Sequence, residues 1–175
     1  MANNIPQLIN SFEVYLDGTR LLGTVTAELP NIQFITQEIK GAGISGSLDV
    51  PVMGHIQNMT AKFTWRIADD SEGIRQLLPQ QYHHLELWSS NQTFDTTSGE
   101  FAPKQQKVIL RACPVGFNLG QLAQQELQNV EMDFQVSYMR WFVNNVEFCE
   151  IDPYNMIFKA HGQDLLASVR SNLGL

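Results

Sequence analysis

The feature that most constrains how this chain folds is an alternation of apolar and polar side chains with a period of two residues. From Asn58 to Ile67 the odd positions are apolar and the even positions are polar. The pattern recurs from Val130 to Tyr138, with the apolar residues at even positions. Because successive side chains of a strand point to opposite faces, each segment is predicted to be a strand with one buried and one exposed face. After Tyr138 the apolar positions shift to Met139 and Trp141, which indicates a β-bulge.

Weaker strand patterns lie on both sides of these two segments, and turn residues such as Asp17-Gly18, Asn144-Asn145 and Asp152-Pro153 separate them. The additional strands are expected at Phe12–Leu16, Leu22–Ala27, Ile32–Gln37, Leu48–Met53, His84–Trp88, Val108–Ala112, Val146–Ile151 and Tyr154–Phe158.

Two short helices are expected between and after the strands. One is capped by Asp70 or Ser71 and stopped by Pro79, and the other spans Leu165–Leu173 with Asp164 as its cap. No repeat, linker, charge run or low-complexity segment divides the chain. We therefore expect a mainly β fold, a sandwich or barrel-like domain with one or two short helices, as a single domain over residues 1–175.

The balance of charges excludes several classes of function. The chain carries 11 Lys and Arg against 18 Asp and Glu, a net charge of −7, and has no basic run that would grip a phosphate backbone. Tight binding of nucleic acid is therefore not expected. No apolar run approaches the ~18 residues that span a bilayer, and the N-terminal MANNIPQLIN lacks the features of a signal peptide. We expect no membrane insertion, and a protein that stays in the cytoplasm or leaves it without an N-terminal signal.

No combination of residues predicts catalysis or a metal site. His83 and His84 are adjacent on an expected strand and so point to opposite faces, and no His, Cys or carboxylate spacing matches a metal site. Glu131 and Asp133 share a strand face, with Glu86 as a further carboxylate, but a solvated polar face explains them better than acid–base catalysis. We expect no catalytic, cofactor-binding or metal-binding residues, and no enzyme.

A glycine-rich segment, Glu38–Ser47, lies between two of the expected strands. Its glycine spacing departs from the dinucleotide-binding pattern, and the segment precedes a strand rather than a helix. We expect an extended, flexible loop here rather than a phosphate-binding turn.

The C-terminal third carries a more specific pattern. Glu150-Ile151-Asp152-Pro153 is followed by Asn155, then by Gly162-Gln163-Asp164-Leu165-Leu166 and Arg170, and the chain ends Asn172-Leu173-Gly174-Leu175. This run closely resembles the C-terminus of the major tail tube proteins of contractile-tailed phages, the P2-like family, and of R-type pyocins. The opening Ile5-Pro6 with Phe12–Gly18, and the glycine-rich segment leading to Leu48–Val52 and Ala61-Lys62-Phe63, resemble the same family. Met156 and His161 are less typical of it.

The resemblance implies a tail tube fold in which strands of neighbouring subunits join one β-barrel around a lumen. It implies hexameric rings that stack into the inner tube of a contractile tail or of a tail-like bacteriocin, so the first partner is the protein itself. The tail sheath protein, the baseplate and the tape-measure protein are the other implied partners, and DNA passes without specific binding. The implied location is the virion or a tail-like particle, assembled in the cytoplasm of a bacterial host. An amide-rich composition, with 16 Gln and 12 Asn, fits a surface covered by other subunits.

A lumen of this kind must let DNA or a tape-measure protein slide, and carboxylates that face it repel phosphate. The polar face of Val130–Tyr138 is therefore predicted to face the lumen, with one further carboxylate as a weaker candidate. The predicted lumen-facing residues are Glu131, Asp133, Gln135, Ser137 and Asp49. The alternative, in which this face meets the sheath and its carboxylates are merely solvated, stays open.

The resemblance also implies that the extended loop, residues 39–47, contacts neighbouring subunits in the next ring, and that both chain termini lie at contacts between rings. The predicted inter-ring residues are Lys40, Gly41, Ala42, Gly43, Ile44, Ser45, Gly46 and Leu175.

Two other interpretations stay open. A tube protein of a type VI secretion system shares the fold, although the C-terminal pattern favours the phage-like branch. A soluble β-sandwich module that binds a small ligand or carbohydrate belongs to a different class, and aromatic residues such as Trp65 and Trp141 would form its cleft. Packing in the core explains these aromatic residues better. Ring formation argues against the module, and saturable ligand binding by a stable monomer argues for it.

Overall fold

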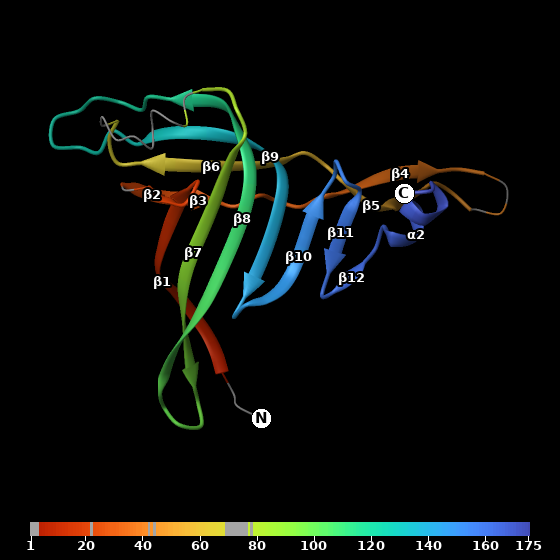
Figure 1. Cartoon of the computed structure of the whole chain (residues 1–175), viewed down its shortest axis with the longest axis horizontal. Coiled ribbons are helices and arrows are strands. Elements are labelled where there is room, and N and C mark those ends of the chain that lie inside the picture. The colour runs from red at the N-terminus through yellow and green to blue at the C-terminus, as the bar shows by residue number, and fades with distance from the viewer. Residues whose placement is uncertain (1–3, 22, 42, 44, 69–76, 78) are drawn as a thin grey trace.

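The structure is a computed structural model that describes residues 4–21, 23–41, 43, 45–68, 77 and 79–175. The strands are β1 (Asn4–Leu16), β2 (Thr19–Leu21), β3 (Thr24–Glu28), β4 (Phe34–Ile39), β5 (Leu48–Ile56), β6 (Met59–Trp65), β7 (His83–Asp95), β8 (Phe101–Asn118), β9 (Val130–Val143), β10 (Val146–Asp152), β11 (Ile157–Ala160) and β12 (Gln163–Asp164). A short helix near the C-terminus, α2, spans Ala167–Asn172 (Figure 1). The prediction of a mainly β fold is confirmed.

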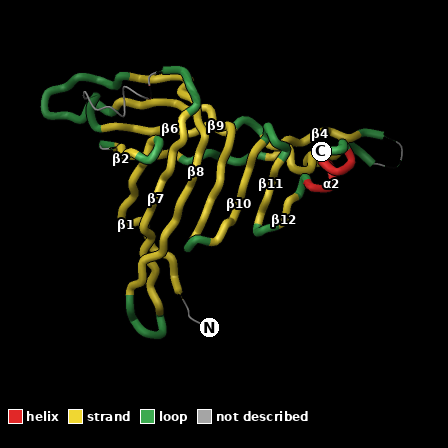
Figure 2. Tube along the Cα trace, viewed as in Figure 1, coloured by secondary structure: helices red, strands yellow, loops and turns green. Residues whose placement is uncertain are grey.

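Ten of the strands form one antiparallel sheet in the order β12-β11-β10-β9-β8-β7-β1-β2, with β6 joined to β9 and β3 joined to β6. The first half of β9, residues 130–136, pairs with β6, and its second half, residues 139–143, pairs with β10. The sheet therefore divides along β9 into two branches, and β8 and β9 bend from one into the other (Figures 1 and 2). The sheets do not close into a barrel within the described part of the chain.

The core lies between the two branches and is built from the alternating residues. Phe63 and Trp65 of β6 and Phe134 of β9 are at most 2% exposed. The ring of Phe63 lies 5.1 Å from that of Phe134 and 6.2 Å from that of Trp65, measured between centroids. Val14 and Leu110, from the other branch, join the same cluster. Full burial of each large apolar side chain contributes about 1.5–3 kcal/mol, so these strands hold the two branches together.

The long strands extend well beyond the segments that alternation predicts. β7 has 13 residues and β8 has 18, whereas only His84–Trp88 and Val108–Ala112 were expected. The missed parts, such as Ser89–Gln92 of β7, are polar at every position and half-buried on both faces. Alternation marks only the part of a strand that covers a core within the subunit, so it does not reveal these outer parts.

The helices differ from the expectation in two ways. The C-terminal helix begins at Ala167, and Leu166 rather than Asp164 occupies its N-cap. Asp164 instead accepts a hydrogen bond from the backbone N–H of Leu166, which places it in a turn ahead of the helix. The helix expected before Pro79 lies outside the described residues except for Leu77, whose side chain is buried in the core.

The bulge predicted after Tyr138 lies one residue before it. Tyr138 is opposite Arg111 and Val136 is opposite Ala112, so Ser137 is an extra residue in the ladder between β8 and β9. An extra residue reverses the direction of the side chains that follow. Tyr138 consequently leaves the apolar face on which the alternation placed it, and Met139 takes that position, with 5% exposure.

β4 and β5 form a separate two-stranded sheet, here called the hairpin, which projects from the body of the molecule (Figure 1). Strands were expected at Ile32–Gln37 and Leu48–Met53, and both are present with shifted ends. At its base the ring of Phe34 lies 5.6 Å from that of Phe158 of β11. Gly54 packs against Leu166, so the C-terminal segment supports the hairpin where it leaves the body.

Candidate functional site

The acidic pair predicted on β9 is present on an exposed face and is partly balanced by a lysine. Glu131 and Asp133 are separated by one residue, and their side chains are 37% and 54% exposed. Lys62 of β6 lies between them, with its Nζ 3.4 Å from Glu131 Oε2 and 3.8 Å from Asp133 Oδ1. The hydrogen bond to Glu131 and the charge of Asp133 raise the pKa of Lys62. This face therefore carries two negative charges and one positive charge.

The other predicted lumen residues are distributed over three places. Gln135 shares the face of the acidic pair and hydrogen-bonds Asn58. Ser137 is only 9% exposed, and its hydroxyl donates to the carbonyl of Arg111 at the bulge. Asp49 lies on β5, opposite Glu38 of β4, and so belongs to the hairpin. The structure therefore brings Glu131, Asp133 and Gln135 together and separates Ser137 and Asp49 from them.

The hairpin has one apolar and one polar face. Ile39 is opposite Leu48 and Gln37 is opposite Val50, and directly opposed residues of a ladder share a face. The same alternation places Val52 on that face, whereas Glu38, Asp49 and Pro51 lie on the other. Ile39 and Leu48 are 42% and 57% exposed. Val50 and Val52, nearer the base, are half-buried. The apolar face is thus uncovered within the subunit toward its tip, although an isolated two-stranded hairpin is at best marginally stable in water.

The predicted inter-ring residues that the structure describes are exposed. Lys40 pairs with Glu38 at 2.9 Å, and a Cβ added to Gly41 or Gly43 would meet no atom within 4 Å. Ser45 and Gly46 are exposed at the tip, whereas Ala42 and Ile44 lie outside the described residues. Leu175 is 78% exposed, and the C-terminus lies at the same end of the molecule as the hairpin (Figure 1).

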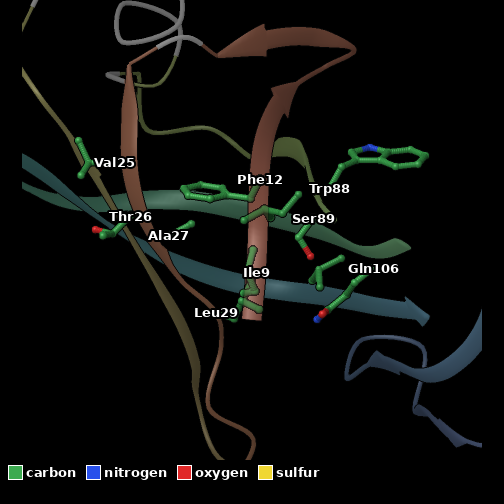
Figure 3. Close-up of a pocket in the computed structure, with 11 residues that line it drawn as sticks. Ile9, Phe12, Val25, Thr26, Ala27, Leu29, Trp88, Ser89 and Gln106 are labelled. Carbon is green, nitrogen blue, oxygen red and sulfur yellow. The ribbon is translucent and has the colours of Figure 1, made fainter. Parts of the chain in front are cut away.

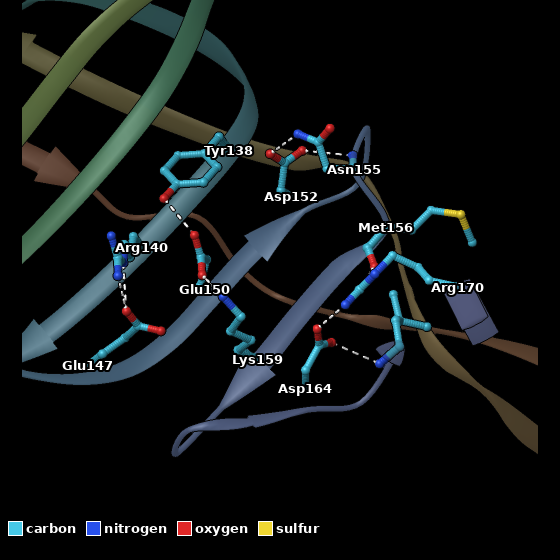
Figure 4. A network of polar contacts seen from close by, with 11 residues as sticks. Tyr138, Arg140, Glu147, Glu150, Asp152, Asn155, Met156, Lys159, Asp164 and Arg170 are labelled. Atoms are coloured by element: carbon cyan, nitrogen blue, oxygen red, sulfur yellow. Dashed lines mark hydrogen bonds and ion pairs between the residues drawn. The ribbon is translucent and has the colours of Figure 1, made fainter. Parts of the chain in front are cut away.

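The C-terminal residues that carry the family resemblance form polar contacts within the subunit (Figure 4). Asp152 accepts hydrogen bonds from the backbone and side chain of Asn155, which closes the turn between β10 and β11. Arg170 of α2 pairs with Asp164 and donates to the carbonyl of Met156 at 2.6 Å. These polar residues thus fix turns and bind the helix to the sheet, which is a structural role.

Three ionisable groups in the same region have shifted pKa values. Burial raises the pKa of Glu150, but hydrogen bonds from Lys159 at 2.7 Å and Tyr138 at 3.0 Å outweigh burial and leave it lowered. Burial and the hydrogen bond to Glu150 raise the pKa of Tyr138 to about 12. The hydrogen bond from Arg170 lowers the pKa of Asp164. Each group is thereby held in the ionisation state that preserves its contacts at neutral pH.

The two positions that are less typical of the family are both left-handed turns. Met156 has a φ of 52° and His161 a φ of 48°. A side chain in this conformation costs about 1–2 kcal/mol relative to a right-handed one. The hydrogen bond from Arg170 to the carbonyl of Met156 helps to hold the first of these turns.

Sequence reasoning missed an apolar surface on the first strand. Residues 4–13 of β1 pair with β7 on one side only, and no other described strand pairs with their outer edge. Ile5, Leu8 and Ile9 on this edge are 50%, 54% and 60% exposed. Polar and apolar residues are mixed there without alternation, so the only signal in the sequence was the absence of charge from residues 4–12.

No group of three or more potential metal-ligating side chains occurs among the residues that the structure describes. Over the same residues, no helix is long and apolar enough to cross a membrane. His83 is 4% exposed whereas His84 is exposed, so the two adjacent histidines do point to opposite faces as expected.

Comparison with known proteins agrees with the resemblance that the C-terminal residues indicate. Residues 6–174 match the family model of the phage tail tube protein FII. The chain is similar to the tail tube protein of Escherichia phage P2, with 24% identity over 182 aligned positions that cover 98% of this chain and 99% of the relative.

Two solved structures share the fold. One is the sheath/tube terminator of an extracellular contractile injection system in its extended state, with a TM-score of 0.55 and 13% identity over 79% of this chain and 96% of that chain. The other is the tube-terminating cap of the anti-feeding prophage, with a TM-score of 0.51 and 14% identity over 75% of this chain and 87% of that chain. Both support the assignment of the fold.

Proposed function

The chain belongs to the family of the phage tail tube protein FII, and on this premise we propose that its copies assemble into hexameric rings that stack into a hollow tube. The coarse role, a structural protein of a phage-type tail tube, follows from membership of the family. The finer proposal is that the tube is the inner conduit of a contractile tail or tail-like bacteriocin, through which DNA or a tape-measure protein passes.

The observation that carries the proposal is the apolar face of the hairpin, which is uncovered toward its tip. Ile39, Leu48 and Val50 lie on one side of a two-stranded sheet that projects away from the core. An exposed apolar sheet face with two open edges favours aggregation unless another chain covers it. Regular self-assembly supplies that cover, and a head-to-tail contact that repeats gives rings or filaments.

The exposed face of β9 is proposed to line the lumen through Glu131, Asp133 and Gln135. Two carboxylates against one lysine give this face a net negative charge in each subunit. Repeated around a ring, that charge repels the phosphates of a passing nucleic acid and offers them no cationic binding site. Ser137 is omitted from the lining because the bulge buries it.

The partners in this proposal are the tail sheath outside the tube and the baseplate and tape-measure protein at assembly. The solved structures of similar fold come from a sheath/tube terminator and a tube-terminating cap, which supports a place in such particles. Assembly in the cytoplasm of a bacterial host is part of the same proposal, as is the absence of any catalytic step.

Negative-stain electron microscopy of the purified, concentrated protein tests the proposal. We expect uniform rings or hollow tubes, because the exposed apolar face and the open edges favour self-association at high concentration. A matched baseplate serves as a nucleus in a second sample, since tubes can require one to begin. Dispersed monomers in both samples would contradict the proposed function.

A further inference from the structure

A pocket that contains two tyrosines, here called the tyrosine pocket, opens beside β9 where the two branches of the sheet meet. It has a volume of about 350 Å³, and none of its described lining residues is charged. The lining residues are Ile56, Gln57, Asn58, Met59, Tyr82, Gln135, Val136, Ser137, Pro153 and Tyr154. Because Gln135 also belongs to the exposed face of Glu131 and Asp133, the pocket adjoins the acidic pair.

Contacts within the subunit hold the walls of the pocket. Met59 and Val136 are only 2% and 3% exposed, so the core fixes them in place. Tyr154 lies in the turn after β10, which the hydrogen bonds from Asn155 to Asp152 close (Figure 4). A ligand therefore meets a largely preformed site and spends little free energy on ordering it.

The polar groups of the pocket suit a polypeptide. Tyr82 and Tyr154 are 50% and 79% exposed, and a hydrogen bond with Tyr154 raises the pKa of Tyr82, so their hydroxyls lie close together. The side-chain amides of Asn58 and Gln135, in the same lining, hydrogen-bond each other. Aromatic rings pack against proline, while hydroxyls and amides pair with the C=O and N–H groups of an extended backbone.

We propose that the tyrosine pocket binds an extended, proline-containing segment of a polypeptide, with a basic residue of that segment directed at the acidic pair. The inference rests on the proposed function and deepens it. Of the two cargoes proposed for the tube, it assigns a binding site on this face to the protein and none to the nucleic acid.

Charge selects the residue that flanks the proline. Asp133 precedes Gln135 by two residues on the same face of β9, a separation of about 7 Å at about 3.4 Å per residue. A polyproline-type segment rises about 3.1 Å per residue, so a lysine or arginine about two to four positions from the proline reaches Asp133 or Glu131. A phosphate meets the same two carboxylates and finds no cation in the described lining of the pocket.

Each pocket would bind weakly, and repetition would supply the retention. A single short segment makes few contacts, although proline limits the conformational entropy that it loses. Stacked rings would offer one pocket per subunit, so a long chain with several such segments is held at many points at once. Each weak contact dissociates quickly, which allows the chain to move along the tube.

The apolar groove beside β1 lacks this combination (Figure 3). It has a volume of about 250 Å³, and its described lining contains no tyrosine. Its two aromatic residues are Phe12 and Trp88, and the indole ring of Trp88 is directed away from Phe12. The groove also contains Gln106, an amide outside the tyrosine pocket that serves as a comparison for Gln135.

Fluorescence anisotropy of a labelled peptide tests the inference. The probe is a short peptide with a run of prolines flanked by lysines, added to the unassembled chain and to assembled tubes. We expect saturable binding that Tyr154→Ala weakens about tenfold, because the peptide loses a stacking surface. Phe101→Ala is the matched control, since Phe101 is an aromatic residue that is 64% exposed and lies outside the pocket, and its affinity for the probe should equal that of the unmodified chain.

Two comparison peptides separate the contributions of proline and charge. Replacement of the lysines by glutamates, or of the prolines by serines, should each weaken binding several-fold. Equal binding of all three peptides, or tighter binding of a single-stranded oligonucleotide, would overturn the inference. Loss of probe binding when the chain assembles would show that a neighbouring subunit fills the pocket, and would overturn it as well.

A second measurement needs no variant. In nuclear magnetic resonance spectra of the unassembled chain, the side-chain amide signals of Asn58 and Gln135 should shift on addition of the probe, whereas that of Gln106 should not. Shifts at Gln106 alone, or no shift at either glutamine, contradict binding in the tyrosine pocket.

The outcome for this inference is distinguishable from that for the proposed function. Normal tubes that do not bind the probe would refute the pocket and leave the tube function intact. A chain that binds the probe at Tyr154 but never assembles would contradict the tube function and leave the pocket in place.

Discussion

At the scale of single residues, Gly54 marks the point where the hairpin rests on the C-terminal segment. Its φ is +68°, and a Cβ at this position would lie 2.4 Å from Leu166 Cδ2 and 2.6 Å from Leu166 Cγ. Leu166 is 5% exposed and cannot move aside without leaving the core cluster. The contact therefore requires a residue without a side chain, both for space and for backbone conformation.

The substitution Gly54→Ala is expected to destabilise the subunit. Overpacking against Leu166 costs about 1–3 kcal/mol, and the left-handed backbone adds to that. For a chain of this size the melting temperature should fall by roughly 4–10 °C, as measured by circular dichroism on the unassembled protein. Gly41→Ala is the control, because Gly41 has open space around it and an ordinary φ, and it should melt within about 1–2 °C of the unmodified chain. Equal melting temperatures for the two variants would contradict the contact.

Ser137 shows why part of the candidate site could not be read from the sequence. Alternation correctly places Glu131 and Asp133 on the exposed face, because both precede the bulge. It then predicts Ser137 on the same face, although the inserted residue turns its side chain inward. The sequence signals that the pattern shifts near Tyr138, but a shift alone does not specify which residue is extra.

At the scale of elements, the hairpin was largely predictable from local pattern, whereas only the family resemblance indicated a role for it. The two strands and the glycine-rich connection follow from local pattern, and so does the tight turn at Asn144-Asn145, where φ values of 49° and 62° suit asparagine. By contrast, the outer halves of β1, β7 and β8 cover no core in the subunit, so no alternation marks them. The partners of these surfaces lie outside the chain, and the pattern of a single sequence does not identify them.

Bulky residues at the tip of the hairpin are expected to impair assembly without unfolding the subunit. Gly41→Val with Gly43→Val removes conformational freedom from the tip, and Gly43 has a φ of +94° that valine tolerates poorly. Neither position contacts the body, so the monomer should keep its circular dichroism spectrum and elution volume. Tubes counted by electron microscopy should become several-fold fewer. Gly99→Val, in the turn between β7 and β8 and also with open space, is the control, and normal tubes from the double variant would contradict the role of the tip.

At the scale of the whole molecule, the few cations are mostly paired across strands. In the branch that contains β7, β8 and β10, Lys107 of β8 lies 2.9 Å from Glu86 of β7, and Arg140 of β9 pairs with Glu147 of β10. On the β6–β9 face, Lys62 is shared by two carboxylates. Partly exposed pairs of this kind contribute little to stability, typically about 0–1 kcal/mol. Their effect is to set the sign of the potential on each face that an assembled tube would present.

Removal of the two carboxylates beside Lys62 should make assembled tubes retain DNA. Glu131→Gln with Asp133→Asn changes the charge of this cluster from −1, one lysine against two acids, to +1 in every subunit. A short single-stranded oligonucleotide should then bind to preformed tubes about tenfold more tightly at 50 mM salt, and the difference should diminish by 200 mM. Fluorescence anisotropy of a labelled oligonucleotide measures the binding.

The matched control for that experiment changes the net charge equally on the other branch. Glu13→Gln with Glu86→Gln removes the partners of Arg20 and Lys107 and raises the net charge by the same two units, from −7 to −5. Little change in oligonucleotide binding is expected from this control. If the control binds and the β9 variant does not, the lumen does not lie on the face of Glu131 and Asp133.

The long ladders of the sheet also determine how a subunit bears mechanical load. β7 and β8 are aligned over twelve consecutive residue pairs, and β8 and β9 continue alongside them. In an antiparallel ladder the hydrogen bonds lie perpendicular to the strands, so a pull along the strands shears many bonds at the same time instead of opening them one pair after another. The sheet is accordingly stiff along its strands, whereas the hairpin, held to the body mainly at its base, can bend. A subunit built in this way transmits force through its sheet and deforms where the hairpin meets the body.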